Sequence, residues 1–273
     1  MTSVQERIFD VRGTRAVVTG AASGLGLAMA EVLADCGAHV TLADVDDARL
    51  ADVATELAER GGTVRSFVVD VSDEAQVAGL VEDVVASEGG IDVVFANAGI
   101  AAVPGPAVEG GQRLDTVERS DWDKVLGVNL NGVLFTLKHA AAVMRRQRSG
   151  RIVVTSSNAG LRPEPVVCYG YTASKAAVLN VVRQAALELA PDGVLVNAIC
   201  PGPFKGTRIG GGVTLDPDPE QERMWATTVP LGRMAEPEEL KGLVLLLASP
   251  ASSFMTGAAY LIDGGTLVLA GSA

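Results

Sequence analysis

Tyr171 and Lys175 lie four residues apart in the run Tyr-Thr-Ala-Ser-Lys. In a helix this spacing places both side chains on one face, so a phenol and an ammonium can act on one small volume. A free tyrosine, with a pKa of about 10, is almost wholly protonated at neutral pH. A cation about 5 Å away, at an effective dielectric of about 20, favours the phenolate by roughly 3 kcal/mol, or about two pKa units. The pair therefore predicts a tyrosine that can exchange protons near working pH.

The spacing alone is also compatible with an accidental pair on a helix surface, and Tyr169 is a rival for the catalytic position. Tyr169 is six residues from Lys175, which places it on another helical face or ahead of the helix. We therefore assign the acid/base role to Tyr171.

A glycine turn near the amino terminus predicts a cofactor site. Residues 15–19 are predicted to form a short buried strand, and residues 27–36 have the apolar spacing of a helix. The glycines between them let the backbone approach a pyrophosphate, and the helix amino terminus offers free N–H groups to the anion. The predicted contacts are Gly20, Ser23, Gly24, Leu25 and Gly26.

Asp44 ends the second predicted strand, residues 38–44. A carboxylate at this place can accept hydrogen bonds from the adenosine ribose and repels a 2′-phosphate. Positions 21–23 and 45 carry no Arg or Lys that could pair with that phosphate. The sequence therefore predicts NAD as the cofactor, with the alternative that Asp44 only caps a helix starting near Asp46.

The glycine turn Thr-Gly-x-x-x-Gly-x-Gly and the run Tyr-x-Ala-Ser-Lys-Ala-Ala together resemble the short-chain dehydrogenase/reductase family, over about residues 12–268. In that family the tyrosine is the acid/base, and the lysine lowers its pKa and holds the nicotinamide ribose. The resemblance implies that Ser157 holds the substrate oxygen. It also implies that Asn129 disturbs its helix and passes protons through a water to the lysine.

The position of the catalytic serine departs from the family pattern. Ser157 stands before x-Ala-Gly as the family serine does, but its gap to Tyr171 is fourteen residues, one more than expected. One extra residue in the Pro163-Glu-Pro165 loop would explain the gap. Ser156 and Asn158 stay open as alternatives.

The remaining cofactor contacts also come from the resemblance. Asp70 could instead cap a helix near Asp73, and Asn97 could be purely structural, because Ala96 makes its motif only a partial match. The turn toward Thr207 is one residue longer than usual. The set comprises Asp70, Val71, Asn97, Ala98, Gly99, Pro201, Gly202, Phe204 and Thr207, together with Tyr171 and Lys175.

Two stretches are predicted to surround the substrate. Residues 100–119 lack periodicity and follow a strand end, where open α/β sheets bind ligands. Residues 204–230 contain Gly210-Gly-Gly212 and then the apolar Met224 and Trp225, a pattern that favours a lid, with an ordinary surface loop as the alternative.

Composition limits the function classes. Of the 273 residues, 22 are Lys or Arg and 33 are Asp or Glu, a net charge of −11 without a basic block, which disfavours nucleic acid and anionic membranes as partners. The longest apolar stretch, 243–248, is too short to span a bilayer. The three cysteines lack the spacing of metal ligands and are typical of a protein in a reducing cytoplasm. The two histidines lie far apart in the sequence, which disfavours a metal site.

The sequence thus predicts a single α/β domain: a Rossmann-like, doubly wound parallel sheet of about seven strands. The predicted reaction is NAD(H)-dependent interconversion of a secondary alcohol and a ketone, on a neutral, apolar or cyclic small molecule. The alternatives are a 3-oxoacyl-[acyl-carrier-protein] reductase and a non-catalytic NAD-binding sensor or scaffold. The resemblance implies that the apolar segments 237–249 and 258–262 form a dimer or tetramer contact.

Overall fold

Short apolar segments of the chain form one parallel sheet. The computed structural model describes residues 4–207 and 219–268. In these residues the strands are β1 (Arg15–Thr19), β2 (His39–Asp44), β3 (Thr63–Val68), β4 (Val93–Ala96), β5 (Gly150–Thr155), β6 (Val194–Pro201) and β7 (Ala259–Ile262). Their order in the sheet is β3-β2-β1-β4-β5-β6-β7, and every neighbouring pair is parallel. The predicted Rossmann-like sheet of about seven strands in a single domain is confirmed.

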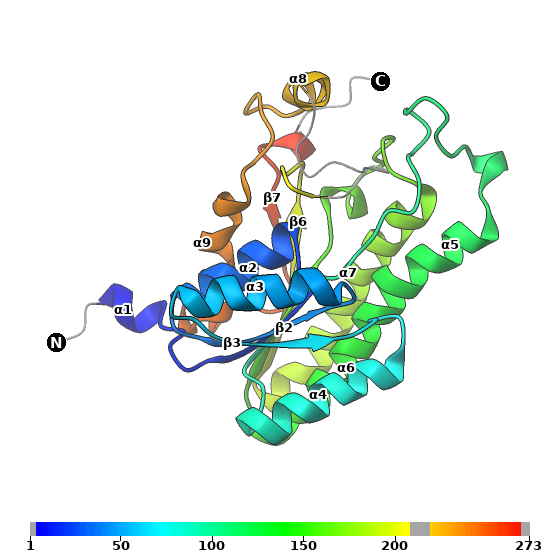
Figure 1. Cartoon of the computed structure of the whole chain (residues 1–273). Coiled ribbons are helices and arrows are strands. Elements are labelled where there is room, and N and C mark those ends of the chain that lie inside the picture. The colour runs from blue at the N-terminus through cyan, green and yellow to red at the C-terminus, as the bar shows by residue number, and fades with distance from the viewer. Residues whose placement is uncertain (1–3, 208–218, 269–273) are drawn as a thin grey trace.

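Helices cover both faces of this sheet (Figure 1). They are α1 (Val4–Ile8), α2 (Gly24–Asp35), α3 (Asp47–Glu59), α4 (Glu74–Glu88), α5 (Arg119–Leu126), α6 (Val133–Gln147), α7 (Tyr169–Leu189), α8 (Pro219–Thr228) and α9 (Lys241–Ala248). One buried apolar cluster joins the sheet to α4, α6 and α7, and a second joins it to α2, α3 and α9. None of the described helices is long and apolar enough to cross a membrane.

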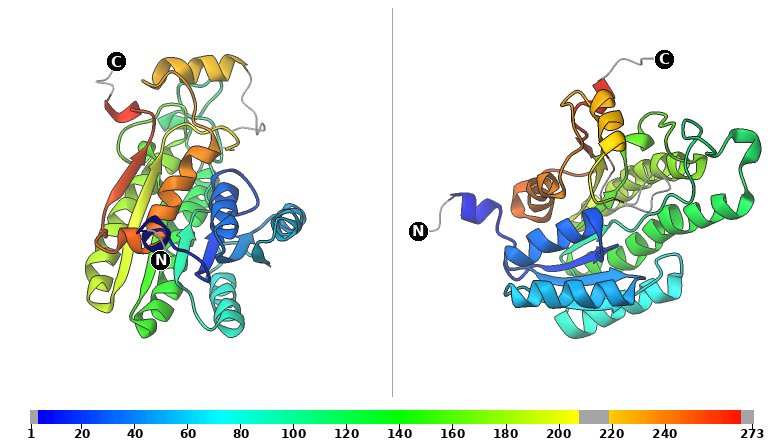
Figure 2. Two further views of the ribbon diagram at one scale, coloured as in Figure 1. Left: turned by 90° about the vertical axis from the view of Figure 1, so that its left-hand side faces the viewer. Right: turned by 45° about the horizontal axis from the view of Figure 1, so that its top comes forward.

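The strand order reverses beside β1, which pairs with β2 on one side and with β4 on the other. Connections leave β1 and β4 toward opposite faces of the sheet, so a crevice opens at their carboxyl ends, where such sheets bind ligands. Figure 2 shows α9 packed beside α2, and α8 standing off at one end of the molecule. In Figure 1, α8 lies above β6 and β7.

The helix that carries Asn129 is interrupted in the structure. α5 and α6 are joined by a stretch of π-helix, Gly127–Gly132, which contains Asn129. Asparagine is a poor residue for a helix interior because its amide competes for backbone partners. Here the amide bonds outside its own helix, to Ile100. The predicted disturbance at Asn129 is confirmed as a widened turn.

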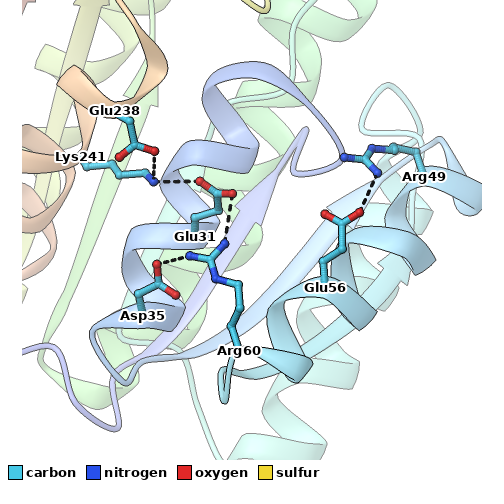
Figure 3. Close-up of polar contacts among 7 residues, drawn as sticks. All are labelled: Glu31, Asp35, Arg49, Glu56, Arg60, Glu238 and Lys241. Carbon is cyan, nitrogen blue, oxygen red and sulfur yellow. Dashed lines mark hydrogen bonds and ion pairs between the residues drawn. The ribbon is translucent and has the colours of Figure 1, made fainter.

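A surface cluster of ion pairs ties α2 to the elements beside it (Figure 3). Arg60, at the end of α3, pairs with Glu31 and Asp35 on α2. Lys241, at the start of α9, lies 2.8 Å from Glu31 and also pairs with Glu238. Single exposed pairs contribute little, but linked pairs restrain the elements that carry them. The cluster therefore helps to hold α2, whose amino terminus faces the crevice.

Candidate active site

A cavity of about 530 Å³ opens at the carboxyl end of the sheet. Its wall is built from the turn between β1 and α2, the ends of the next strands, α7 and the segment after β6. The predicted residues that line it are Gly20, Ser23, Gly24, Leu25, Asp44, Asp70, Val71, Asn97, Ala98, Gly99, Ser157, Tyr171, Lys175, Pro201, Gly202, Phe204 and Thr207. Two predicted residues, Gly26 and Asn129, are not part of the lining and are buried.

Tyr171 and Lys175 project from the buried face of α7, with Ser174 beside them. The Lys175 ammonium lies over the Tyr171 ring, 5.7 Å from its centroid. The same Nζ donates a 2.7 Å hydrogen bond to the carbonyl oxygen of Thr155 at the end of β5. Both side chains are almost fully buried. Tyr169 is also helical, but it borders a separate groove between α5 and α7.

Ser157 is the serine that contacts the phenol. Its hydroxyl lies close enough to Tyr171 to lower the pKa of that phenol, and its oxygen accepts a 3.1 Å bond from the N–H of Ala159. Ser156 turns the other way, because its hydroxyl donates to the carbonyl oxygen of Lys175 at 2.7 Å. Asn158 lines the cavity too and accepts a 3.1 Å bond from Ser157. Of the three candidates, the geometry favours Ser157.

The expectation that Lys175 lowers the phenol pKa is not met in the structure. Burial raises the pKa of Tyr171 to about 12, opposed by the hydrogen bond with Ser157. Burial also lowers the pKa of Lys175 to about 8. A low-dielectric site disfavours the charged form of either group. Burial is therefore the largest influence on the pKa of both groups.

Asn129 is completely buried behind the cavity wall. Its Oδ1 accepts a 2.8 Å bond from the N–H of Ile100, while its Nδ2 donates to the Ile100 carbonyl at 2.9 Å and to Ser174 Oγ at 3.2 Å. A Cβ on Gly99 would lie 3.3 Å from both Asn129 Oδ1 and Lys175 Nζ. Asn129 and Lys175 therefore both approach Gly99.

The glycine turn fits an anionic group. Gly20 and Gly24 have φ of +70° and +56°, and a Cβ on Gly26 would lie 1.9 Å from the carbonyl oxygen of Gly20. Gly26 is thus needed for packing α2 against the turn. Ser23, the N-cap of α2, makes no side-chain capping bond, and the first turn contains no acidic residue. Free N–H groups and the positive end of the helix dipole therefore face the cavity.

The two acidic candidates at strand ends are not helix caps. Asp44 accepts bonds from the N–H groups of Ala22 at 3.0 Å and Asp46 at 3.1 Å, whereas Asp46 caps α3. Asp70 accepts bonds from the N–H and hydroxyl of Ser72, whereas Asp73 caps α4. The capping alternatives for Asp44 and Asp70 are wrong. Both carboxylates line the cavity.

Asn97 joins three strand ends as well as lining the cavity. Its amide donates to the carbonyl oxygen of Thr19 at 3.1 Å and accepts a 3.0 Å bond from the hydroxyl of Thr155. Its backbone N–H donates to the Thr19 hydroxyl at 3.0 Å. The structural role that the sequence left open for Asn97 is therefore present, because one amide holds β1, β4 and β5 in register.

The segment after β6 is described only as far as residue 207. Thr207 lines the cavity and donates a 3.0 Å bond to the Phe204 carbonyl. The predicted glycine hinge, residues 210–212, lies outside the described residues. Beyond it, Trp225 on α8 lines the cavity, and Lys205 lies 3.0 Å from Glu222 on α8. Of the loop predicted over residues 100–119, Ile100 and Ala101 reach the cavity.

Sequence reasoning missed Glu164, Val166 and Val167, which line the cavity near Tyr171. These residues follow the 3-10 turn η3 (Asn158–Gly160) and precede α7. The segment has no hydrophobic period, so pattern alone gives no signal there. The one available signal in the sequence was an acidic residue between two prolines, Pro163-Glu-Pro165. It places a carboxylate in a site that the sequence predicts to take a neutral, apolar or cyclic molecule.

Comparison with known proteins gives the same identification. Residues 20–266 match a family model described as enoyl-(acyl carrier protein) reductase. The chain is 39% identical to cis-4-hydroxycyclohexanecarboxylate dehydrogenase of Sinomonas cyclohexanicum over 250 residues, which cover 92% of this chain and 95% of that one. It is 36% identical to galactitol 2-dehydrogenase of Agrobacterium fabrum, covering 92% of this chain and 96% of that one. It is also 36% identical to a 3-oxoacyl-[acyl-carrier-protein] reductase of Thermotoga maritima, covering 94% and 99%.

Among solved structures, a gluconate 5-dehydrogenase from Burkholderia cenocepacia, in complex with NADP and tartrate, superposes with a TM-score of 0.87 at 30% identity. The match covers 97% of this chain and 99% of that structure. The chain belongs to the short-chain dehydrogenase/reductase family of nicotinamide-dependent oxidoreductases.

Proposed function

We propose that this enzyme interconverts a secondary alcohol and a ketone with NAD(H), using Tyr171 as the acid/base. The observation that carries the proposal is one group of side chains in the cavity wall: Ser157 and the Tyr171 phenol, with the Lys175 ammonium over the phenol ring. A substrate oxygen placed between the phenol and the serine hydroxyl can receive or give a proton there. The bound nicotinamide supplies or accepts the hydride.

The side chains around the phenol have separate roles. Ser157 holds the substrate oxygen and polarises it. Lys175 provides the positive charge of the site, and its bond to the Thr155 carbonyl fixes its direction. Asn129 anchors the segment at Ile100 and sits beside Lys175 at Gly99. We assign it the step that connects the lysine to solvent.

The choice of NAD over NADP rests on Asp44. Its carboxylate lines the cavity and is held by two backbone N–H groups, so it is fixed in place. Two cations occur in the described part of the lining. Lys175 donates to Thr155, and Lys205 is paired with Glu222 and Glu236. A 2′-phosphate near Asp44 would meet a negative charge, whereas ribose hydroxyls would meet an acceptor.

A neutral substrate is favoured over an acyl chain on a carrier protein. The substrate end of the cavity is mostly apolar, with Ile100, Val166, Val167 and Trp225 in its wall. The net charge of −11 disfavours docking of an acidic carrier. The 3-oxoacyl reductase remains the second candidate within enzymes, because one relative carries that name. Comparing initial rates with NADH and NADPH on one ketone separates the two candidates.

Three further proposals concern the setting of the enzyme. We infer that the described parts of the predicted lid, residues 204–207 and 219–230, cover the substrate, since Trp225 lines the cavity and Lys205 ties α8 to the segment after β6. We infer a homo-oligomer, since Phe254 and Leu261 near β7 are exposed apolar side chains. The free thiols Cys36, Cys168 and Cys200 are compatible with a cytoplasmic setting.

The test compares two tyrosines on the same helix. Tyr171→Phe is expected to lose turnover by at least about 10²–10⁴ while it still binds NADH, because acid/base work contributes that much. Tyr169→Phe is the matched control, since Tyr169 borders the other groove and does not line the cavity. Retained turnover in Tyr171→Phe would refute the assignment. NADH binding without oxidation of any alcohol by the unaltered enzyme would favour the sensor or scaffold.

A further inference from the structure

Glu164 places a carboxylate in the wall of the cavity that holds the reacting phenol. It lines the cavity and its side chain is 10% exposed. Its charge acts directly on Tyr171, whose pKa it helps to raise. The other acids of the lining, Asp44 and Asp70, stand at the ends of β2 and β3 in the cofactor half. Glu164 is therefore the carboxylate of the substrate half.

The bonds that Glu164 makes leave part of its acceptor capacity unused. Arg162 lies 3.5 Å away, at the limit of a hydrogen bond, and is anchored by a 2.8 Å bond to the Thr266 carbonyl. The N–H of Val166 also bonds to the carboxylate. A carboxylate offers about four acceptor sites. Among the described residues no further donor meets this carboxylate, so its remaining acceptor sites are left to water or to a bound substrate.

The neighbours of Glu164 cannot replace that water. Val166, Val167 and Ile100 contribute apolar surface, and Trp225 closes the wall from α8. A buried acceptor that loses its partner is destabilised, more so when it is charged. A substrate that excludes water from this half must bring its own hydrogen-bond donor, or it leaves Glu164 unpaired.

We propose that Glu164 selects substrates that carry a second hydroxyl close to the reacting carbinol, namely vicinal diols and polyols. This inference rests on the proposed alcohol dehydrogenase function and specifies its substrate class. The reacting hydroxyl is held by Ser157 and Tyr171, and the second hydroxyl donates to Glu164. The apolar wall then contacts the C–H surface of the substrate, with the ring of Trp225 as one side.

The same geometry discriminates against charged substrates. A substrate carboxylate in this half would face Glu164 and be repelled. An ammonium would pair with Glu164, but Arg162 already balances the charge of this acid. A neutral donor therefore fits the pair best, because it adds a hydrogen bond without adding charge.

The test measures kcat/KM for matched alcohols that differ by one group: cyclohexanol against 1,2-cyclohexanediol, and 2-butanol against 2,3-butanediol. The wild-type enzyme is expected to prefer the diol of each pair by about 10- to 100-fold, the range of a hydrogen bond to a charged group. Glu164→Ala should reduce this ratio toward one. Glu164→Gln keeps an acceptor oxygen and should retain part of it.

Because the readout is a ratio within each variant, a general loss of activity does not affect it. Glu59→Ala is the matched control, since Glu59 is exposed on α3 and should leave the ratio unchanged. Equal efficiency with mono-alcohols and diols in the wild type, or an unchanged ratio in Glu164→Ala, overturns the proposal. So does a preference for 2-aminocyclohexanol over the diol. No turnover of any alcohol with either cofactor refutes the dehydrogenase function itself.

Discussion

Replacing Lys175 with methionine should stabilise the protein while it abolishes turnover. Burial lowers the pKa of Lys175 from 10.5 to about 8. Each pKa unit corresponds to about 1.36 kcal/mol, so holding this lysine protonated at pH 7 costs the folded state about 3 kcal/mol. The bond to the Thr155 carbonyl, worth about 1 kcal/mol, is lost in the variant. The net gain is about 2 kcal/mol, or about 4–8 °C in melting temperature.

The dependence on pH separates this cause from better packing of methionine. A lysine whose folded pKa is depressed destabilises fully below that pKa, and the penalty disappears as pH rises toward the unfolded value. The advantage of Lys175→Met should therefore be complete at pH 7, shrink above about pH 8 and be lost before pH 10.5, above which the missing bond to Thr155 leaves the variant about 1 kcal/mol less stable than wild type. Thermal melts at fixed protein concentration measure it, with the exposed Lys124→Met as control. A variant that melts lower than wild type at pH 7, or a difference that ignores pH, would refute the electrostatic reasoning.

Three other substitutions test the site and its supports. Asn129→Ala removes three buried hydrogen bonds and should destabilise the protein by about 3 kcal/mol in thermal melts. Asn131 is exposed in the same π-helical stretch, so Asn131→Ala should change the melting temperature little. Equal melting temperatures of the two variants would contradict the anchoring role of Asn129. Gly26→Ala places a Cβ 1.9 Å from a backbone oxygen and should weaken NADH binding at least about tenfold in a fluorescence titration. Gly79 lies on α4, and a Cβ added there meets nothing within 4 Å, so Gly79→Ala should instead add about 0.5–1 kcal/mol to the free energy of unfolding. Similar effects of Gly26→Ala and Gly79→Ala would be inconsistent with close packing at the turn. Asp44→Asn should raise the NADPH-to-NADH ratio of kcat/KM by about tenfold, and an unchanged ratio would show that Asp44 does not select the cofactor.

The regular elements were predictable because their patterns are strong. A fully buried parallel strand is a short apolar run, as in residues 150–155, and the structure forms β5 from those residues. The glycine turn, Asp44 and the helix of Tyr171 were found because each occupies a fixed place relative to a strand or helix. Ser157 was found from its motif, despite the unusual spacing to Tyr171.

What could not be predicted depends on contacts between distant segments. Glu164 carries no periodic signal, and its place in the cavity follows from how the Pro163-Glu-Pro165 segment returns to α7. The raised pKa of Tyr171 needs the burial of the whole site, whereas spacing alone shows only the nearby Lys175. The cavity contact of Trp225 likewise requires α8 to fold back across the end of the sheet. None of these features is local in the chain.

The central position of β1 has a consequence for synthesis on the ribosome. The chain emerges in the order β1, β2, β3, so the β3-β2-β1 half of the sheet can assemble while one edge of β1 still lacks β4. An unpaired, apolar strand edge invites association with other chains. We expect nascent chains to be most prone to aggregation in this interval, and slower translation of residues 69–92 to prolong it.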